Sequence, residues 1–260
     1  MKDFVKDCQL NFVRYITIST IILNTASNVY LVENIETREL LICKQVFLSK
    51  EYDAFPELNA LKTLHHPNIV RMSKYRVTDN SIYIFEEYIN GGDMLDIIIN
   101  YKYIPEHDAR IYFKQLISAL EYIHSKDLVH LDVKLDNILV RDMEIKLCDF
   151  GFVHNINDPL SRVCGTLNFI SPEVWNKEEY VSGKADMWSA GVCLYTLLCG
   201  KLPFKTQKTR NYADYHFNHI GFDKISNLAI DLIVKLLQAD PYKRLSSTEC
   251  LKHAWFEAKL

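Results

Sequence analysis

The stretch His130-Leu131-Asp132-Val133-Lys134-Leu135-Asp136-Asn137 and the shorter Asp149-Phe150-Gly151 after it carry the densest chemical signal in the chain. Asn137 and Asp149 offer hard oxygen atoms, which are the ligands that Mg²⁺ prefers. Both residues adjoin predicted short strands, so we expect their side chains to face one site. Asp132 lies on the same loop, where a carboxylate can act as a general base.

A set of this kind suits the transfer of a γ-phosphoryl group. That reaction needs magnesium, a cation on the phosphates, and a group that receives or orients the hydroxyl proton. Lys134 follows Asp132 closely and can neutralise the phosphate during transfer. We therefore predict ATP and Mg²⁺ as the cofactors, with Asp132 as the base and with Asn137 and Asp149 as the metal ligands.

Size and composition limit the classes of protein to which this chain can belong. Its 260 residues are enough for one large domain or two lobes. A content of 48% hydrophobic and 24% charged residues is typical of a folded globular chain. The net charge of −3 gives no general attraction for nucleic acid or anionic membranes. We expect neither as a partner, and the oligomeric state stays open.

No apolar run approaches the roughly 18 residues that a membrane span needs. The seven cysteines are scattered and include no C-x-x-C pair, which argues against a zinc site or a redox pair. We expect them to be reduced and mostly buried. Such usage is typical of a reducing compartment, so the expected location is cytoplasmic or nuclear.

The first third of the chain is rich in Ile, Val, Leu and Tyr and predicts five strands and one helix. The helix is predicted over Pro56 to Leu64, with Pro56 at its first position, where no amide donor is missed. The polar stretch Asn34 to Glu39 predicts a turn between the second and third strands. The strands are Tyr15 to Leu23, Val29 to Glu33, Leu40 to Phe47, Val70 to Tyr75 and Ser81 to Tyr88.

The pattern changes after Asn90-Gly91-Gly92-Asp93, a turn cluster that we interpret as the boundary between two lobes. Apolar residues then recur at helical spacing. The expected fold class is α+β, with a single domain over residues 1–260 and lobes at about 1–89 and 90–260. The elements predicted in the second lobe are helices over Asp108 to Ser125, Lys184 to Leu198 and Asn227 to Leu237, and short strands near Ile138 to Val140 and Ile145 to Cys148.

Ser171-Pro172-Glu173 and Asp186-Met187-Trp188-Ser189-Ala190-Gly191 complete a series of motifs in this chain. Their order and spacing resemble those of the eukaryotic-type serine/threonine protein kinases, from about Tyr15 to Phe256. The resemblance implies the bilobal protein kinase fold, with an N-terminal five-stranded antiparallel sheet and one helix, and a C-terminal, mainly helical lobe. The Asp-x-Lys-x-x-Asn form of the loop resembles the serine/threonine kinases rather than the tyrosine kinases.

Several residue roles follow from this resemblance alone. It implies that Lys44 holds the α- and β-phosphates and that Glu57 pairs with it. Thr166 resembles the threonine that bonds the catalytic aspartate and lysine, and is counted with the catalytic residues. The implied nucleotide site is completed by Ile22, Asn24, Val29, Ile42, Glu87, Ile89, Asp93 and Leu139, of which Asp93 would contact the ribose.

The resemblance also implies structural roles for polar residues. Glu173 should form a buried bridge with Arg244. Asp186 should hold the backbone of the catalytic loop. His130 is expected to be a core histidine, and it is assigned no part in proton transfer.

The chain departs from the family at the loop that covers the nucleotide phosphates. Counting back from Val29, the three glycine positions hold Ile22, Asn24 and Ser27. Glycine lets backbone amides approach the phosphates closely and adopt positive φ angles. We therefore expect weaker ATP binding, by ~1–3 kcal/mol if one or two amide contacts are lost.

Two other departures concern regulation and the adenine pocket. Leu131 replaces the arginine that usually grips a phosphorylated residue of the activation segment, and the phosphorylated position aligns with Arg162. The prediction is a kinase that needs no activation-segment phosphorylation. Glu86 aligns with the gatekeeper at the back of the adenine pocket, where a carboxylate is costly to bury. It is expected either to contact a cation such as Lys44 or to tilt towards water.

Hints about the substrate come from acidic residues. Asp93 and Asp136 resemble residues with which some kinases read an arginine before the target hydroxyl, which predicts a modest preference for basic substrates. Ordinary surface or capping roles are equally open for both. The stretch Gly165 to Glu173 and Leu131 resemble a baculovirus-type late protein kinase, a viral protein. That origin would imply a basic Ser/Arg-rich DNA-packaging protein as substrate, in the host cell, whereas a stripped-down cellular kinase is the competing interpretation.

Two other functions stay open. The missing glycines and Glu86 would suit a pseudokinase scaffold with weak or no ATP turnover. A scaffold, however, has no chemical need for a complete set of phosphate, metal and base residues, so catalysis is favoured. A kinase for small molecules or sugars is disfavoured, because Ser171-Pro172-Glu173 suits a peptide substrate.

Overall fold

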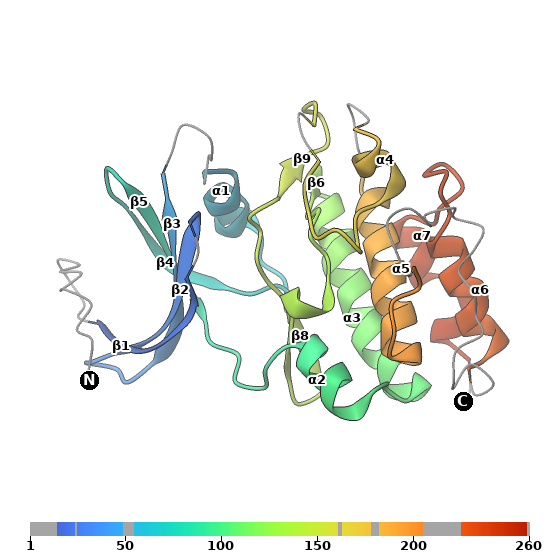
Figure 1. Cartoon of the computed structure of the whole chain (residues 1–260), viewed down its shortest axis with the longest axis horizontal. Coiled ribbons are helices and arrows are strands. Elements are labelled where there is room, and N and C mark those ends of the chain that lie inside the picture. The colour runs from blue at the N-terminus through green and yellow to red at the C-terminus, as the bar shows by residue number, and fades with distance from the viewer. Residues whose placement is uncertain are drawn as a thin grey trace. The chain divides into compact units, whose positions relative to one another are not determined.

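The computed structural model describes residues 15–23, 25–48, 55–160, 163–177, 182–204 and 225–258. The chain forms two compact units. The first comprises Met1–His65 and Val70–Ile89, and the second comprises His66–Ile69 and Asn90–Leu260. Figure 1 shows the strands of the first unit in blue and green-blue and the helices of the second in green to red. Asn24 and Arg162 lie outside the described residues.

The first unit contains a five-stranded antiparallel sheet and one helix, as predicted. The strand order in the sheet is β1-β2-β3-β5-β4. Strand β5 lies between β3 and β4, and its residues Ile82 and Ile84 are fully buried. The apolar residues that predicted strands therefore fill the interior of this unit. The elements are β1 (Tyr15–Leu23), β2 (Ser27–Asn34), β3 (Leu40–Phe47), α1 (Phe55–Thr63), β4 (Met72–Val77) and β5 (Ser81–Glu87).

The register of this sheet gathers several predicted nucleotide-site residues on one face. Ile22 pairs with Val29, and Val29 pairs with Lys44. Residues paired directly across antiparallel strands point to the same face, as do residues two apart on one strand. Ile42 and its partner Glu86 therefore belong to the same face as Lys44.

The predicted turn between β2 and β3 is confirmed, and Asn34 builds it. Its Oδ1 accepts hydrogen bonds from the amides of Glu36 at 3.0 Å and Thr37 at 3.2 Å. Its own amide donates to the carbonyl of Glu39 at 2.9 Å. The asparagine side chain thus replaces backbone partners that the turn would otherwise lack.

Several predicted boundaries in this unit were wrong by one or two residues, and two of them are instructive. Strand β4 begins at Met72 and not at Val70, which is buried but precedes the ladder. An apolar pattern does not distinguish a strand from a buried connection. Helix α1 begins at Phe55, so Pro56 is its second residue and not its first. The amide that proline lacks is still one of the four that have no acceptor within a helix.

The second unit is mainly helical, as predicted. Strand β6 (Leu128–Val129) pairs with β9 (His154–Asn155), and β7 (Ile138–Arg141) pairs with β8 (Glu144–Leu147). The short helices α2, α4 and α7 had no predicted counterpart, because few turns give little periodicity. The helices are α2 (Met94–Tyr101), α3 (Glu106–His124), α4 (Pro172–Trp175), α5 (Lys184–Cys199), α6 (Asn227–Leu236) and α7 (Ser247–Leu251), with 3-10 helices η1 (Leu135–Asn137) and η4 (Ala254–Phe256).

Helix α5 forms the centre of this unit, since every residue from Ala185 to Cys199 is buried. The buried pair predicted between Glu173 and Arg244 is confirmed. Arg244 donates from Nη1 to Oε1 at 2.6 Å and from Nη2 to Oε2 at 2.9 Å. This two-pronged geometry is the strongest form of such a pair. In the part of the chain that the structure describes, no helix combines the length and apolarity needed to cross a membrane.

Candidate active site

Both carboxylate oxygens of Asp132 are held by neighbouring groups of the second unit. Oδ1 accepts from the amide and from Oγ1 of Thr166, each at 2.7 Å. Oδ2 accepts from Nδ2 of Asn137 at 3.1 Å and lies 3.0 Å from Nζ of Lys134. Asp132 is only 3% exposed. Its carboxylate is therefore fixed in orientation before any substrate arrives, as catalysis by a positioned base requires.

Lys134 and Thr166 are also bonded to each other. Nζ of Lys134 donates to Oγ1 of Thr166 at 2.8 Å, while that hydroxyl donates to Asp132. The resemblance implied these contacts of Thr166. Together they form a closed ring of hydrogen bonds around one carboxylate, in which each polar atom has a defined partner.

His130 is held as a neutral structural residue. Its Nδ1 accepts from the amide of Asp132 at 3.2 Å, so the ring proton must lie on Nε2, which faces the carbonyl of Cys148 at 3.1 Å. The ring contacts Phe150 edge-on, with 4.8 Å between centroids. Because both nitrogens are used inside the loop, neither can exchange a proton with a substrate.

Asp186 fixes the backbone that leads into Asp132. It accepts from the amides of His130 and Leu131, each at 2.8 Å, and from Nε2 of His124 at 2.9 Å. Burial raises the pKa of Asp186, but the hydrogen bonds from His124 and from the His130 amide outweigh it and hold the pKa below its usual value. Leu131 itself has a φ of 62°, a conformation that leucine rarely adopts.

Asn137 and Asp149 present a donor set that fits Mg²⁺. Nδ2 of Asn137 donates to the backbone and side-chain oxygens of Asp132, so Oδ1 is the atom of this side chain that would hold a metal. The amide of Cys148 donates to the carbonyl of Asn137 at 3.0 Å, which joins the two loops, and Asp149 follows with a φ of 61°. Strained backbone of this kind gathers at functional sites.

Two oxygen donors are too few to hold Mg²⁺ by themselves. Among the described residues there is no group of three or more His, Cys, Asp or Glu side chains that could bind a metal. Mg²⁺ commonly takes its remaining ligands from water and from substrate phosphates. The pair Asn137 and Asp149 therefore fits a metal that arrives together with a phosphate ligand.

Lys44 and Glu57 form an ion pair within the first unit. Nζ of Lys44 lies 2.5 Å from Oε1 of Glu57, which is in the first turn of α1. The side chain of Glu57 is 1% exposed and that of Lys44 is 11% exposed. A carboxylate at the start of a helix is also favoured by the helix dipole. The lysine is thus anchored by Glu57, and its side chain keeps a small exposed fraction.

The other residues predicted for the nucleotide site fall in both units. Ile22 is half exposed at the end of β1, and Ile89 is buried just after β5. Oε1 of Glu87 accepts from the amide of Arg71 at 2.8 Å. In the second unit, Asp93 caps α2 by accepting from the Asp96 amide, and its backbone pairs with Leu139.

Glu86 is 6% exposed, so the predicted alternative in which it tilts towards water was wrong. It lies on β5 opposite Ile42, within the sheet. The alternative in which the carboxylate contacts a cation stays a prediction.

Gly165 and His124 belong to the site but were not singled out from the sequence. Gly165 has a φ of 92°, and a Cβ there would lie 2.3 Å from the carbonyl oxygen of Leu131. Only glycine therefore lets Thr166 approach the catalytic loop so closely. The positive φ has no local signature in this sequence, and His124 looks like any polar residue near the end of a helix.

Comparison with known proteins agrees with this geometry. A family model described as a protein kinase domain matches residues 24–256. The serine/threonine-protein kinase DCLK3 of Homo sapiens is 36% identical over 239 residues, which cover 85% of this chain and 37% of that protein. The carbon catabolite-derepressing protein kinase of Secale cereale is 38% identical over 206 residues, or 76% of this chain and 40% of that protein.

A third relative, the serine/threonine-protein kinase cds1 of Schizosaccharomyces pombe, is 34% identical over 215 residues, which cover 77% of this chain and 47% of that protein. This chain therefore belongs to the protein kinase family. Two of the three relatives named here are serine/threonine-protein kinases by name, as the sequence motifs predicted. The chain spans less than half the length of each of them.

The contact at Gly165 can be tested by substitution. Gly165→Ala should push Thr166 away from Asp132 and lower kcat by about 10²-fold, the loss expected when a reacting group is misplaced by about 1 Å. Gly92→Ala is the matched control, because Gly92 also has a positive φ, of 80°, but a Cβ there would meet nothing closer than 3.6 Å. Both variants should lose about 1–2 kcal/mol of stability from backbone strain. An equal fall in kcat for both would contradict this account of Gly165.

Proposed function

We propose that this protein is a serine/threonine protein kinase that transfers the γ-phosphoryl group of ATP to hydroxyl groups of proteins. The observation that carries the proposal is the fixed carboxylate of Asp132, with Lys134, Asn137 and Thr166 all bonded to it. A scaffold that only binds partners gains nothing from orienting a buried carboxylate in this way. Serine/threonine kinase names among the relatives support the same activity.

Each residue of the second unit has a defined task in this proposal. Mg²⁺ and ATP, when bound, supply the phosphoryl group and neutralise part of its charge. Asp132 orients the incoming hydroxyl and accepts its proton, while Lys134 faces the transferring group. Asn137 and Asp149 hold the metal by their oxygen atoms. Thr166 keeps the carboxylate and the ammonium group in register.

Lys44 supports the nucleotide from the first unit. Its ammonium group is held by Glu57 through one carboxylate oxygen, and its side chain is 11% exposed, so its other N–H donors can pair with phosphate oxygens. The neighbouring loop explains how a chain without the three glycines can fold there. Ile22 lies inside β1, and Ser27 begins β2 with a conventional negative-φ backbone. The strands therefore tolerate side chains at these positions, although backbone amides approach the phosphates less freely.

A measurement of phosphate transfer distinguishes this proposal from the pseudokinase alternative. We expect wild-type protein with Mg-ATP to phosphorylate a serine peptide with upstream arginines, and Asp132→Asn to lose about 10²–10⁴-fold in kcat. Mg-ATP should raise the melting temperature of both proteins, because Asp132 does not hold the nucleotide. The measurement is incorporation of γ-phosphate, with a peptide of the same length carrying upstream aspartates run in parallel.

Equal incorporation of phosphate by wild type and Asp132→Asn would mean that the activity does not come from this site. That result would favour the pseudokinase scaffold. Faster transfer to the aspartate peptide would overturn the proposed basic preference alone. That preference is supported by Asp93, Asp96 and Asp136 lying near one another. Burial raises the pKa of Asp93, and the charges of Asp96 and Asp136 raise it further despite the Asp96 amide. A substrate arginine would relieve this repulsion.

We further propose that the activation segment needs no phosphate to hold it. Leu131 lies in a buried apolar cluster with Cys164 and Ile170 of that segment, and with Val129, Val174 and Ala185. Strand β9, in the same segment, pairs with β6 beside the catalytic loop. Apolar packing thus joins the segment to the position where many kinases place an arginine for a phosphate. Burial of this kind is insensitive to phosphorylation state.

Phosphatase treatment tests this second proposal. The treated protein should keep the kcat of the untreated protein, and Leu131→Ala should lose about 2–5 kcal/mol of stability together with activity, because it opens a cavity in the cluster. Dephosphorylation should be verified by intact mass. A large loss of kcat after complete dephosphorylation would refute phosphorylation-independent activity.

The remaining parts of the functional hypothesis concern its biological setting. The resemblance to a baculovirus-type late protein kinase favours a basic Ser/Arg-rich DNA-packaging protein as substrate, and a cytoplasmic or nuclear location in a host cell. Acidic residues near α2 are compatible with such a substrate. The substrate hypothesis can be tested by comparing phosphorylation of a basic DNA-packaging protein with that of an acidic protein of equal serine content. Faster phosphorylation of the acidic protein would contradict the hypothesis.

A further inference from the structure

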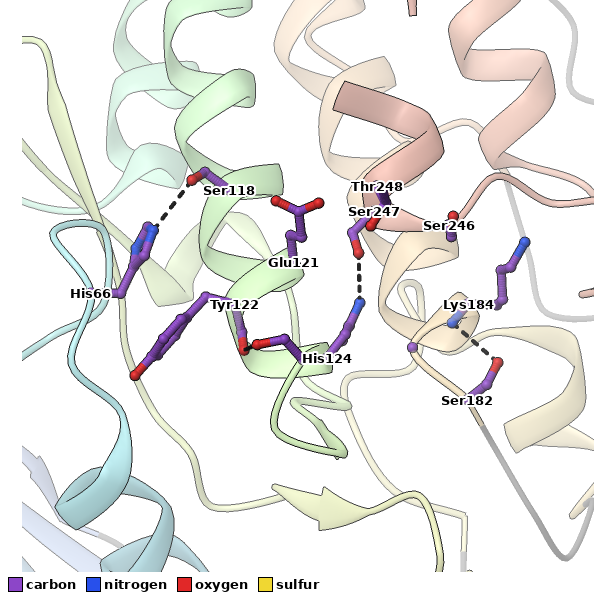
Figure 2. Close-up of a pocket in the computed structure, with 12 residues that line it drawn as sticks. His66, Ser118, Glu121, Tyr122, His124, Ser182, Lys184, Ser246, Ser247 and Thr248 are labelled. Carbon is purple, nitrogen blue, oxygen red and sulfur yellow. Dashed lines mark hydrogen bonds between the residues drawn. The ribbon is translucent and has the colours of Figure 1, made fainter. Parts of the chain in front are cut away.

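A cavity of about 690 Å³ lies in the second unit, beside the carboxyl-terminal half of α3, the start of α5 and α7 (Figure 2). It contains none of the residues proposed to contact ATP, the metal or the substrate hydroxyl. Its volume falls within the range of about 300–1,000 Å³ that is usual for ligand sites. Ser118, Glu121 and Tyr122 are spaced three and four residues apart on α3, so they share the face that lines it.

Two histidine–serine pairs stand in this cavity. Nε2 of His66 lies 3.2 Å from Oγ of Ser118, and Nδ1 of His124 lies 3.1 Å from Oγ of Ser247. Figure 2 shows the side chain of Glu121 between the two pairs, with no dashed line reaching it. The walls of the cavity are therefore mostly hydroxyl groups and histidine ring nitrogens.

Neither histidine offers a free N–H donor to an anionic ligand. Nδ1 of His66 accepts from the amide of Asn68 at 3.1 Å and so has no place for a second proton. Burial lowers the pKa of His66, and the charge of Lys146 lowers it further. His124 is bonded at both ring nitrogens, to Ser247 and to Asp186. An anion would find no free donor on either ring.

Lys184 is the cationic side chain among the described lining residues, and it is already engaged. Its ammonium group donates to the carbonyl of Arg244 and lies 3.3 Å from the carboxylate of Glu249. Those bonds draw it towards α7 and away from Glu121. A phosphate or carboxylate ligand would have to break them, so an anion does not suit this cavity.

Glu121 differs from Lys184 because its charged group is not engaged by another described residue. Its side chain is half-buried, and among the described residues none donates a hydrogen bond to its carboxylate or forms an ion pair with it. A single carboxylate does not make a metal site, and no described group of three or more His, Cys, Asp or Glu side chains could hold one. With an anion and a metal ion excluded, the ligand that fits this cavity is an organic cation with several N–H donors.

We propose that this cavity is a docking site for an arginine side chain of a basic protein segment, bound by the Glu121 carboxylate. A guanidinium group is planar and can donate two parallel hydrogen bonds to one carboxylate. Neighbouring hydroxyls of Ser118 and Ser247 accept its remaining donors. The ring of Tyr122 already has Lys126 5.5 Å from its centroid, which marks it as a surface that attracts cations.

The probe is a peptide of alternating arginine and glycine without Ser, Thr or Tyr, so its binding does not depend on phosphate transfer. Titration calorimetry on the whole chain should give binding that Glu121→Gln weakens by at least about tenfold, as loss of a charge-assisted hydrogen bond predicts. Ser125→Arg should weaken it too, because a guanidinium four residues after Glu121 on the helix competes for the same carboxylate. Glu144→Gln, at an exposed carboxylate on β8, should bind like wild type.

Three results would overturn the proposal. One is absence of binding by wild type. Another is equal affinity of wild type and Glu121→Gln. The third is loss of binding in Asp96→Asn with no loss in Glu121→Gln, which would place the peptide near α2 instead. Loss in Glu121→Gln and in Ser125→Arg, with Glu144→Gln unchanged, supports it whether or not the protein phosphorylates anything.

Discussion

The carboxylate of Asp186 lies in the first turn of α5 and accepts hydrogen bonds from the amides of His130 and Leu131 and from Nε2 of His124. Leu131 has a left-handed backbone, which costs about 1–2 kcal/mol for an L-residue. The hydrogen bonds to Asp186 hold Leu131 in this left-handed conformation. Because the pKa of Asp186 is lower when folded, its stabilisation is complete above the unfolded pKa and is lost as the pH falls through the folded one.

The left-handed turn at Leu131 has two consequences for the active site. The turn at Leu131 sends its carbonyl towards Gly165, whose missing Cβ lets Thr166 bond Asp132. The side chain of Leu131 turns into the apolar cluster that holds the activation segment. One residue therefore links the orientation of the base to the position of the segment. Arginine at this position would carry charge into that cluster, and this is the physical basis of the proposal that the segment needs no phosphate to hold it.

Sequence motifs predicted the features that depend on residue order along the chain. The other features depend on packing between segments that are distant in the sequence. The sheet, the central helices and the Glu173–Arg244 pair could be predicted, because apolar periodicity and motif spacing encode them. The ring around Asp132 followed from resemblance. The burial of Glu86 and the left-handed turn at Leu131 could not be predicted, since both depend on neighbours distant in the sequence. Glu121 carried no signal either, because a lone glutamate on a helix is ordinarily solvated.

The most direct measurement of this account is kcat for Asp186→Asn, determined on protein shown to be folded by circular dichroism. An asparagine keeps one oxygen acceptor and presents its NH2 group to the other backbone amide, either that of His130 or that of Leu131, so kcat should fall by about 10²-fold or more as Asp132 is displaced. Asp231→Asn is the matched control, since Asp231 also accepts from a histidine at 2.9 Å but lies on α6 at the surface. Its kcat should equal that of wild type. A folded Asp186→Asn protein with wild-type kcat would contradict the claim that this carboxylate positions the catalytic loop.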